Sequence, residues 1–322
     1  MQAGPEEIAE AVRRLKAGRL VAFPTETVYG LGARALDAAA VARVFEVKGR
    51  PARNPVIVHV SGPEMAPMAA AAWPREAEAL ARAYWPGPLS MVLPKAAGVP
   101  DIVTAGGPTV AVRCPDHPVT LALIEALGEP IVGPSANVSG RVSPTRAEHV
   151  RESFDEETVF VLDGGACTGG IESTVVDLSG SLPRVLRPGL VTGEMIAGVI
   201  GRAVGTADRE GPGEGGVLAS PGLLDVHYAP KTRAVLVSAE EAERLCAGRG
   251  GAVVVIAWGE GARAGDIVLP RDARGYAAGL YAALREADGR GAELIAVIRP
   301  QATGEHELWA AVMDRLRRAT SR

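Results

Sequence analysis

The sequence predicts an α/β protein with two parts: an α+β-like N-terminal domain, built on a twisted mixed sheet with helices around it, and a small Rossmann-like C-terminal domain. Through residues 1–200, many short apolar segments of strand length occur with few helical segments between them. Residues 232–322 follow a regular strand–helix–strand order. Residues 201–231 are rich in glycine and proline, so we interpret them as a linker, which either closes over the first domain as a lid or acts as a passive tether.

The elements of the first domain follow from local patterns. Apolar side chains at helical spacing predict a helix over 5–17, which Gly18 ends, and a helix over 37–48 with Asp37 as its N-cap. Two more helices are expected over 73–85 and 119–127. Short apolar runs predict strands over 20–23, 56–60, 89–93, 110–113, 130–133, 158–163, 173–178 and 185–187.

The C-terminal domain is expected to alternate strands with longer helices. Strands are predicted over 234–238, 252–258, 266–270 and 294–299, and helices over 239–247, 273–288 and 307–318. The G-x-G-x-x-G fingerprint of dinucleotide-binding domains does not occur there. The pattern therefore predicts a Rossmann-like shape without that cofactor motif.

Composition excludes several classes of protein. The 322 residues are 47% hydrophobic and 22% charged, which is typical of a folded globular chain rather than a disordered one. The net charge of −4 gives no electrostatic footprint for bulk nucleic-acid binding. Three scattered cysteines have no metal-binding spacing and fit a reducing compartment. The first ten residues lack a signal-peptide pattern, and no apolar run could cross a bilayer, so we expect a cytoplasmic protein.

Polar side chains gather where several expected strands or helices end. Thr27 lies in segment 24–32, which is either a functional loop or a plain turn with hydroxyl caps. A helix is expected to end at Lys48, and Arg50 follows it in a loop, where the two cations either bind phosphate or simply lie at the favourable end of the helix dipole. Arg113 shares a strand face with Thr109, which suggests either an anion site in a concavity or a solvated edge-strand arginine.

Further polar clusters occur at 133–140, 163–177 and 186–189. A P-loop and a G-x-S-x-G nucleophile elbow are both absent from the sequence. The residue inventory is therefore one of cations and hydroxyls rather than of a nucleophile with its base.

The order, spacing and residue types of these segments together resemble the L-threonylcarbamoyladenylate synthases, in their two-domain form. The matching segments are FPTETVYGLG (23–32), FEVKGRP with NP and VH (45–60), WPGPL (85–89), TVAVR (109–113), PSANVSG (134–140), SPTRAEHV (143–150), LDGG (162–165), ESTVVD (172–177), LRPG (186–189) and SPG with HYAPK (220–231). Gly133 stands where alanine often precedes the PSAN segment of the family. The resemblance is strong over residues 6–232 and weaker beyond them.

The resemblance implies a concave nucleotide pocket and a nucleotidyltransferase activity. Such an enzyme condenses L-threonine, bicarbonate and ATP to L-threonylcarbamoyl-AMP, pyrophosphate and water. The product then serves the N6-threonylcarbamoylation of adenosine at tRNA position 37, through a downstream transferase machinery. Mg²⁺ is expected to arrive with the ATP phosphates rather than in a cage of side chains. Neither direct contact with tRNA nor an oligomeric state follows from the resemblance.

The resemblance also assigns site residues. Residues expected around threonine are Thr27, His59, Arg113, Gly133 and Ser173. Residues expected around ATP are Lys48, Arg50, Asn54, Thr109, Ser135, Asn137, Ser143, Arg187, His227 and Tyr228. Within these sets, the guanidinium of Arg113 is suited to a bidentate grip on the threonine carboxylate.

Two other functions stay open on the sequence. The same fold occurs as a carbamoyl-transfer module inside larger enzymes, although this chain shows no zinc-finger-like cysteines. Alternatively, the strand-end arginines could bind the phosphates of RNA without any catalysis. Pyrophosphate release that requires both threonine and bicarbonate would separate the synthase from both.

Overall fold

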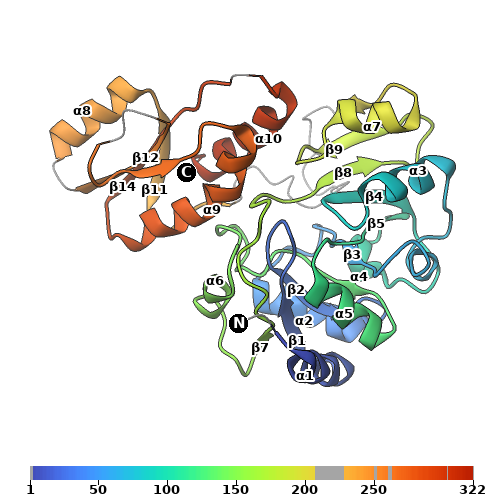
Figure 1. The fold of residues 1–322 in the computed structure, drawn as a ribbon. Helices are drawn as coiled ribbons and strands as arrows, with labels where there is room; N and C mark the ends of the chain where they lie inside the picture. Colours follow the sequence, from blue (N-terminus) through green and yellow to red (C-terminus); the bar gives the residue numbers. More distant parts are fainter. Residues whose placement is uncertain (1–2, 207–227, 250–251, 260–262, 303, 322) are drawn as a thin grey trace.

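Two separate sheets organise the chain (Figure 1). The computed structural model describes residues 3–206, 228–249, 252–259, 263–302 and 304–321. The first sheet has ten strands and includes both parallel and antiparallel pairs, and the second has four strands that are all parallel. This arrangement confirms the predicted mixed α/β fold with a second, smaller α/β domain.

The first domain contains eight described helices and ten described strands. Its helices are α1 (Pro5–Lys16), α2 (Ala38–Lys48), the 3-10 helix η1 (Ala66–Met68), α3 (Arg75–Tyr84), α4 (Asp101–Thr104), α5 (Pro118–Leu127), α6 (Ala147–Arg151) and α7 (Gly193–Ile200). Its strands are β1 (Leu20–Phe23), β2 (Gly30–Arg34), β3 (Val58–His59), β4 (Leu89–Pro94), β5 (Thr109–Arg113), β6 (Ile131–Val132), β7 (Val159–Val161), β8 (Thr174–Asp177), β9 (Arg184–Arg187) and β10 (Gly205–Thr206). The order across the sheet is β10-β9-β8-β4-β5-β3-β6-β2-β1-β7.

Both faces of this sheet are covered by apolar clusters, as strand alternation requires. In β1, Leu20 and Ala22 belong to the largest core cluster. Val21 and Phe23 point the other way, into a second cluster that contains residues of α1 and α5. A third, small cluster lies on one face of β4, β5, β8 and β9 and includes Ala111 and Ile57. That small cluster leaves room beside it for polar side chains of the same face.

The helix α2 shows how local sequence sets up the functional region. The side chain of Asp37 accepts hydrogen bonds from the backbone N–H groups of Ala39 and Ala40, at 3.0 and 3.1 Å, as predicted for an N-cap. The helix ends where Gly49 adopts a left-handed conformation with φ of 58°. The turn at Gly49 therefore sends Arg50 away from the helix axis.

Several elements differ from the sequence expectations. The segment 24–32 is not only a turn, because Gly30 starts β2, which pairs antiparallel with β1. β3 covers two residues of the expected 56–60, and α3 begins after Pro74 rather than at Trp73. Pro74 is the N-cap residue of α3 and disfavours a helical conformation for Trp73, which explains the later start of that helix. The helices α6 and α7 were not predicted.

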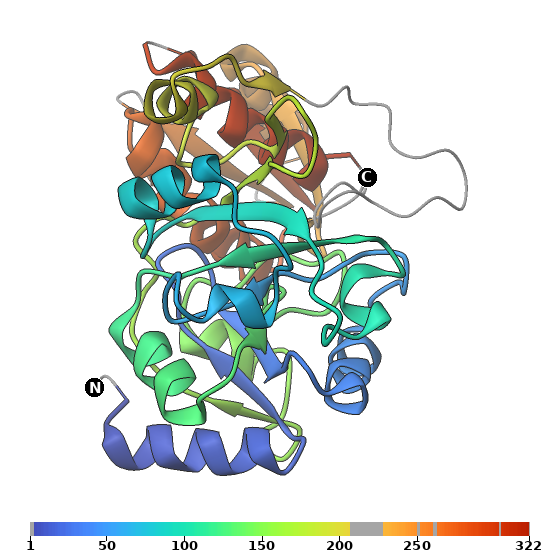
Figure 2. The same ribbon diagram turned by 90° about the vertical axis from the view of Figure 1, so that its right-hand side faces the viewer.

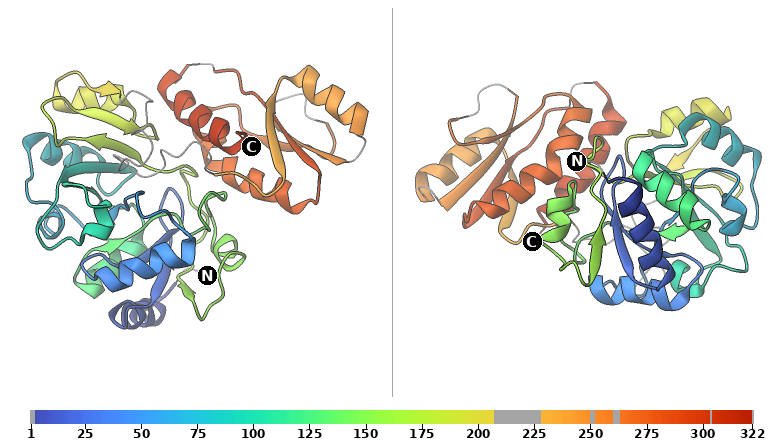
Figure 3. Two further views of the ribbon diagram at one scale, coloured as in Figure 1. Left: turned by 180° about the vertical axis from the view of Figure 1, so that it is seen from behind. Right: turned by 60° about the horizontal axis from the view of Figure 1, so that its bottom comes forward.

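The C-terminal domain matches its predicted pattern closely. It contains β11 (Arg233–Val237), α8 (Ala239–Arg249), β12 (Val253–Trp258), β13 (Ile267–Leu269), α9 (Ala273–Gly289), β14 (Leu294–Ile298) and α10 (His306–Ala319). The strand order is β11-β14-β12-β13. Helix α8 lies on one face of this sheet, and α9 and α10 lie on the other (Figure 3). Apolar residues of these helices form the clusters on the two faces.

The two domains meet through α9 and α10 (Figures 1 and 2). The core cluster of the C-terminal domain continues into the first domain, where it includes Val28, Val142 and Ile171. Polar contacts add to this interface: the Arg285 guanidinium donates to the carbonyl of Val142 at 2.6 Å and pairs with Glu152 at 3.1 Å. The domains are thus packed against each other and not only connected along the chain.

The interpretation of 201–231 as a linker and lid stays a prediction. Residues 207–227 lie outside the described part of the chain. Before them, β10 pairs with β9, so the first sheet extends to Thr206. Within the described ranges, none of the helices has the length and apolar character needed to span a membrane.

Candidate functional site

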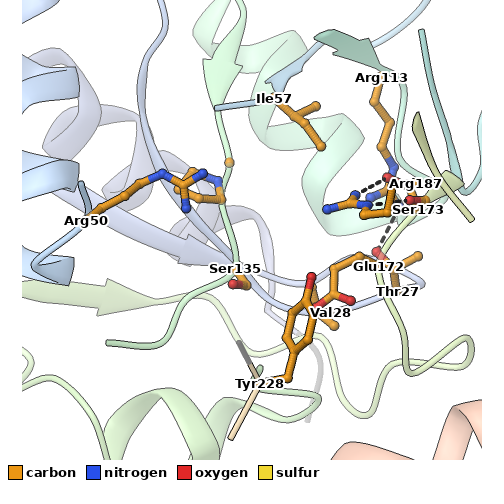
Figure 4. Close-up of a pocket in the computed structure, with 12 residues that line it drawn as sticks. Thr27, Val28, Arg50, Ile57, Arg113, Ser135, Glu172, Ser173, Arg187 and Tyr228 are labelled. Carbon is orange, nitrogen blue, oxygen red and sulfur yellow. Dashed lines mark hydrogen bonds between the residues drawn. The ribbon is translucent and has the colours of Figure 1, made fainter. Parts of the chain in front are cut away.

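A pocket opens on the face of the first sheet that carries the small apolar cluster (Figure 4). Its lining comes from strand ends and from the loops that follow them. The lining residues are Thr27, Val28, Arg50, Ile57, Arg113, Gly133, Pro134, Ser135, Glu172, Ser173, Arg187 and Tyr228. Eight of these were predicted from the sequence as site residues, and they come from segments far apart in the chain.

Arg113 lies at the end of β5, on the same strand face as Ala111, as alternation predicted. Its guanidinium is 4% exposed and pairs with Glu26 at 2.6 Å. It also donates to the hydroxyl of Thr27 at 3.0 Å and to the carbonyl of Gly87 at 3.3 Å. Glu26 was not predicted as a site residue, although it belongs to the recognised 23–32 segment. Its contact fixes the direction in which the guanidinium faces the pocket.

Arg187, at the end of β9, lies beside Ser173. The Arg187 guanidinium donates to the backbone carbonyl of Ser173 at 3.0 Å and to its hydroxyl at 3.1 Å. The Ser173 hydroxyl is also hydrogen-bonded to the hydroxyl of Ser90 at 2.8 Å. Burial lowers the pKa of Arg187 from its ordinary value. Because an arginine titrates far above neutrality, it still carries its charge at pH 7.

Arg50 reaches the opposite side of the pocket from α2. Its guanidinium donates to the backbone carbonyls of Asn54 at 2.9 Å and Pro55 at 2.6 Å. Burial lowers the pKa of Arg50 to about 10, which still leaves the group charged near neutral pH. The 50–55 loop thus holds the guanidinium in place through two backbone oxygens.

Lys48 is buried beneath the pocket rather than in its lining. Its ammonium donates to the backbone carbonyls of Ser135 and Asn137. Burial, followed by the charge of Arg50, lowers the pKa of Lys48 well below its ordinary value. Lys48 therefore holds the 135–137 loop that carries the lining residue Ser135.

His59 lies directly behind Gly133. Its ring packs edge-on against Phe23, with ring centroids 5.4 Å apart. A Cβ atom at position 133 would come within 2.7 Å of the His59 ring and 2.6 Å of the Phe23 ring. Burial lowers the pKa of His59 well below its ordinary value, so the imidazole is neutral at pH 7. Its Nδ1 atom is buried without a hydrogen-bond partner in the described structure.

Three further predicted residues, Asn54, Asn137 and Thr109, are described by the structure but do not line the pocket. Both side-chain polar atoms of Asn54 are buried with no partner among the described residues. The Asn137 amide donates to the carbonyls of Val138 and Arg141 at 2.8 and 3.0 Å. Thr109 lies at the far end of β5, opposite Pro94 of β4. His227 falls outside the described residues.

Glu172 was missed by the sequence reasoning, although it opens the recognised ESTVVD segment. Its carboxylate accepts hydrogen bonds from Ser143 at 2.8 Å, from Tyr281 at 2.9 Å and from Arg315 at 3.1 Å. Burial by itself raises the pKa of Glu172, but the charges of Arg315 and Arg187 outweigh it, so the pKa lies below its usual range. Glu172 is therefore a carboxylate at neutral pH. Its position was not predictable because two of its partners come from the C-terminal domain.

Tyr228 covers the pocket from the start of the C-terminal part. It is 1% exposed and has a positive φ of 62°. Its ring stacks on that of Tyr281, with centroids 5.5 Å apart, and the Arg315 guanidinium lies 5.8 Å from its centre. Ala229 next to it donates to the carbonyl of Gly140 at 3.0 Å. Burial raises the pKa of the Tyr228 hydroxyl to about 12.

The charges of the lining favour an anionic ligand. Arg50, Arg113 and Arg187 all line the pocket, and each is at most 9% exposed. Glu172 is the acidic residue among the described lining side chains, and Arg315 neutralises it from behind. Buried guanidinium groups with fixed orientations are suited to planar carboxylates and to phosphates.

Comparison with known proteins places the chain in a family. The family model Sua5_yciO_yrdC, described as telomere recombination, matches residues 13–189. A second model, described as the C-terminal domain of threonylcarbamoyl-AMP synthase, matches residues 191–321.

Individual relatives agree with both matches. The chain is 47% identical over 233 residues to a threonylcarbamoyl-AMP synthase of Pyrococcus abyssi, which covers 69% of this chain and 65% of the relative. It is 45% identical over 229 residues to one of Bacillus subtilis, covering 70% of this chain and 64% of the relative. These alignments thus span slightly less than two thirds of the curated relatives.

The chain is also similar to a crystal structure of P. abyssi Sua5 complexed with L-threonine, with 41% sequence identity and a TM-score of 0.88. This similarity covers 98% of the chain and 94% of that structure. The fold and both family matches agree, and the chain belongs to the Sua5_yciO_yrdC family.

Proposed function

We propose that the protein is an L-threonylcarbamoyladenylate synthase. It joins L-threonine, bicarbonate and ATP to give threonylcarbamoyl-AMP, pyrophosphate and water. The observation that carries the proposal is the convergence of Arg50, Arg113 and Arg187 with the hydroxyls of Thr27 and Ser173 in one pocket. Names of relatives from an archaeon and a bacterium support the same activity.

The threonine side of the reaction is assigned to Arg113 and its neighbours. Arg113 offers the fork that a carboxylate binds, while Glu26 and Thr27 fix its orientation. Ser173 and the backbone of Gly133 lie in the same lining. The threonine amine, once deprotonated, captures CO₂ or bicarbonate to form a carbamate in this region.

The nucleotide side is assigned to Arg50, Ser135, Arg187 and Tyr228, which also line the pocket. A carbamate oxygen attacks the α-phosphate of ATP, and the bond from that phosphorus to the bridging oxygen breaks to release pyrophosphate. Transfer of this kind depends mostly on positioning and charge stabilisation. Arginines held by backbone carbonyls and neighbouring side chains supply both without rearranging.

Mg²⁺ would accompany ATP rather than occupy a protein cage. Among the described residues there is no cluster of three or more metal-ligating side chains. Glu172, the acidic residue of the described lining, already accepts bonds from Ser143, Tyr281 and Arg315. The fit of the pocket to a protein-bound metal is therefore poor, and the residues' proposed task is to hold the phosphates and exclude water.

The downstream role follows from the product. A mixed carbamic–phosphoric anhydride is labile, so a transferase that uses it on tRNA position 37 would have to accept it promptly. We therefore propose that the protein supplies that tRNA-modifying machinery, as the resemblance implies.

The test is a pyrophosphate-release assay with purified protein, combined with detection of threonylcarbamoyl-AMP by mass spectrometry. Release should require ATP, L-threonine and bicarbonate together. Release without threonine, or with carbamoyl phosphate replacing bicarbonate and threonine, would support a carbamoyl-transfer module instead. RNA binding with no pyrophosphate release under any combination would support the RNA-binding alternative.

A further inference from the structure

Glu172 connects the pocket to the C-terminal domain. It lines the pocket, yet the groups that hold its Oε2 atom belong to α9 and α10 of the other domain. Arg315 of α10 is 0% exposed and donates both to that carboxylate oxygen, at 3.1 Å, and to the backbone carbonyl of Glu172, at 3.4 Å. Tyr281 of α9 donates its hydroxyl to the same oxygen at 2.9 Å.

The same two residues hold Tyr228. The ring of Tyr281 stacks on Tyr228, and the guanidinium of Arg315 lies over the Tyr228 ring. Figure 4 shows Glu172 and Tyr228 side by side at the pocket wall. Two side chains of the C-terminal domain therefore support two adjacent parts of the lining.

The negative charge of Glu172 explains why support from the C-terminal domain matters for nucleotide binding. The pocket presents cations, and its proposed nucleotide carries several negative charges. A carboxylate in that wall would repel the nucleotide unless a cation compensated it closely. Arg315 provides that cation from the side that faces away from the pocket. Breaking a buried ion pair by removing one partner leaves an uncompensated buried charge, which is strongly unfavourable.

We propose that Arg315 is a positioning residue for nucleotide binding: it neutralises and orients Glu172 and fixes Tyr228, so that the C-terminal domain completes the pocket of the first domain. The inference rests on the proposed synthase function, because it takes ATP to be the anionic ligand. It assigns a task in the site to the C-terminal domain, none of whose described residues after 231 lines the pocket.

The charged and titratable groups around Glu172 come from several elements. They are Arg315 with Asp314 behind it on α10, Tyr281 on α9, Tyr228, and Arg187 on β9. Ser143 adds a hydrogen bond from the first domain. Among these groups Arg315 is the cation in direct contact with the carboxylate. Its removal should therefore raise the pH at which Glu172 becomes protonated.

The experiment measures binding of α,β-methylene-ATP by titration calorimetry to the full-length protein and its variants. Arg315→Met should weaken binding at pH 8.5 by about 15- to 30-fold, the effect of one unpaired charge at roughly 8–10 Å with an effective dielectric constant of about 20. The loss relative to wild type should shrink at pH 6, because without Arg315 a larger fraction of Glu172 is protonated there than at pH 8.5. The double variant Glu172→Gln with Arg315→Met should regain most of the affinity at pH 8.5.

Two further variants separate positioning from folding. Arg317→Met changes an exposed residue of the same helix and should bind as wild type does. Arg315→Lys keeps the charge and should retain more affinity than Arg315→Met. If Arg315→Met fails to fold, Tyr281→Phe removes one hydrogen bond to Glu172 but keeps the ring. It should show a smaller loss of affinity at both pH values, because Arg315 still compensates the carboxylate.

Two results would overturn the inference. One is that Arg315→Met binds with wild-type affinity at both pH values. If Arg315→Met does not fold, wild-type affinity of Tyr281→Phe at both pH values has the same meaning. The other is a double variant that binds as weakly as Arg315→Met alone. Synthesis of threonylcarbamoyl-AMP by the wild-type protein is measured in parallel. Its absence refutes the proposed function, whereas its presence with unaffected variants refutes only the role of Arg315.

Discussion

At the scale of single residues, the pocket is built from arginine guanidinium groups, and neighbouring residues fix the orientation of each group. Arg113 is held by Glu26 and Thr27, and Arg50 by backbone carbonyls of its own loop. A guanidinium that is already oriented loses little entropy when it binds a ligand. Substitution of these residues should therefore weaken ligand binding.

Arg113→Ala should weaken L-threonine binding by about 10- to 150-fold, the range for a lost charge-assisted hydrogen bond of roughly 1.5–3 kcal/mol. Titration calorimetry with threonine measures the change. Arg82→Ala is the matched control, because Arg82 lies on the exposed surface of α3. Unchanged threonine affinity in the Arg113 variant would assign the carboxylate to another partner.

Arg50→Lys and Arg187→Lys should each bind α,β-methylene-ATP more weakly than wild type does. A lysine keeps the charge but loses the planar fork, so it cannot serve the backbone oxygens and a phosphate together. The alanine variants should be weaker still. Wild-type affinity in both lysine variants would show that charge alone suffices at these positions.

Gly133→Ala should lower the free energy of unfolding by about 1–3 kcal/mol, as expected for overpacking a close-packed site. The added methyl group would meet the rings of Phe23 and His59, which are themselves tightly enclosed. Thermal unfolding measures the loss. Gly128→Ala is a contrast of another kind, because a Cβ atom at position 128 would meet open space, but the backbone there has a positive φ of 77°. A Gly133 variant as stable as wild type would mean that the two rings can shift at no cost.

At the scale of elements, α2 shows how caps place a functional side chain. Asp37 caps the start of the helix and Gly49 ends it. As a result Lys48 contacts the 135–137 loop, whereas Arg50 lines the pocket. The sequence predicts this helix well because its caps are local signals. It does not predict that β2 starts at Gly30, because strand pairing with β1 depends on residues outside the segment.

Asp37→Ala should destabilise the protein by about 1 kcal/mol, the usual cost of losing an N-cap. For a domain of this size that corresponds to a fall in Tm of about 2–4 °C. Differential scanning calorimetry measures it. Asp37→Asn preserves an accepting oxygen and should lose less. Equal losses in the two variants would contradict a capping role and favour the ion pair of Asp37 with Arg34.

At the scale of the whole molecule, burial of histidines links stability to pH. Burial lowers the pKa of His59, His117 and His149, and that of His149 to about 4 from 6.5. Because the unfolded chain binds these protons more readily, their contribution is fully present above about pH 6.5. It is lost progressively as the pH falls from 6.5 towards 4.

His149→Gln should therefore flatten the decline in stability between pH 6.5 and 5. His149 Nδ1 accepts a hydrogen bond from the Thr145 backbone at 3.3 Å, which a glutamine oxygen could also accept. Urea unfolding at pH 7, 6 and 5 gives the slopes for wild type and variant. Parallel slopes would show that His149 does not contribute to the pH dependence.

The sequence by itself determined the helices with clear caps and periodicity, the alternation of strands and helices in the C-terminal domain, and eight of the pocket-lining residues. These depend on local patterns and on recognisable polar segments at strand ends. The tertiary structure decided which of the recognised polar groups face the pocket. Lys48 and Asn137 hold a loop, whereas Ser135 on that loop lines the cavity.

Only the tertiary structure decided the role of Glu172. Its carboxylate is compensated by Arg315, which is 143 residues away along the chain and belongs to the other domain. Sequence spacing gives no sign of such a contact, because a buried ion pair depends on how two domains pack. The charge of the pocket is therefore a property of the assembled molecule, although the residues that provide it were almost all visible in the sequence.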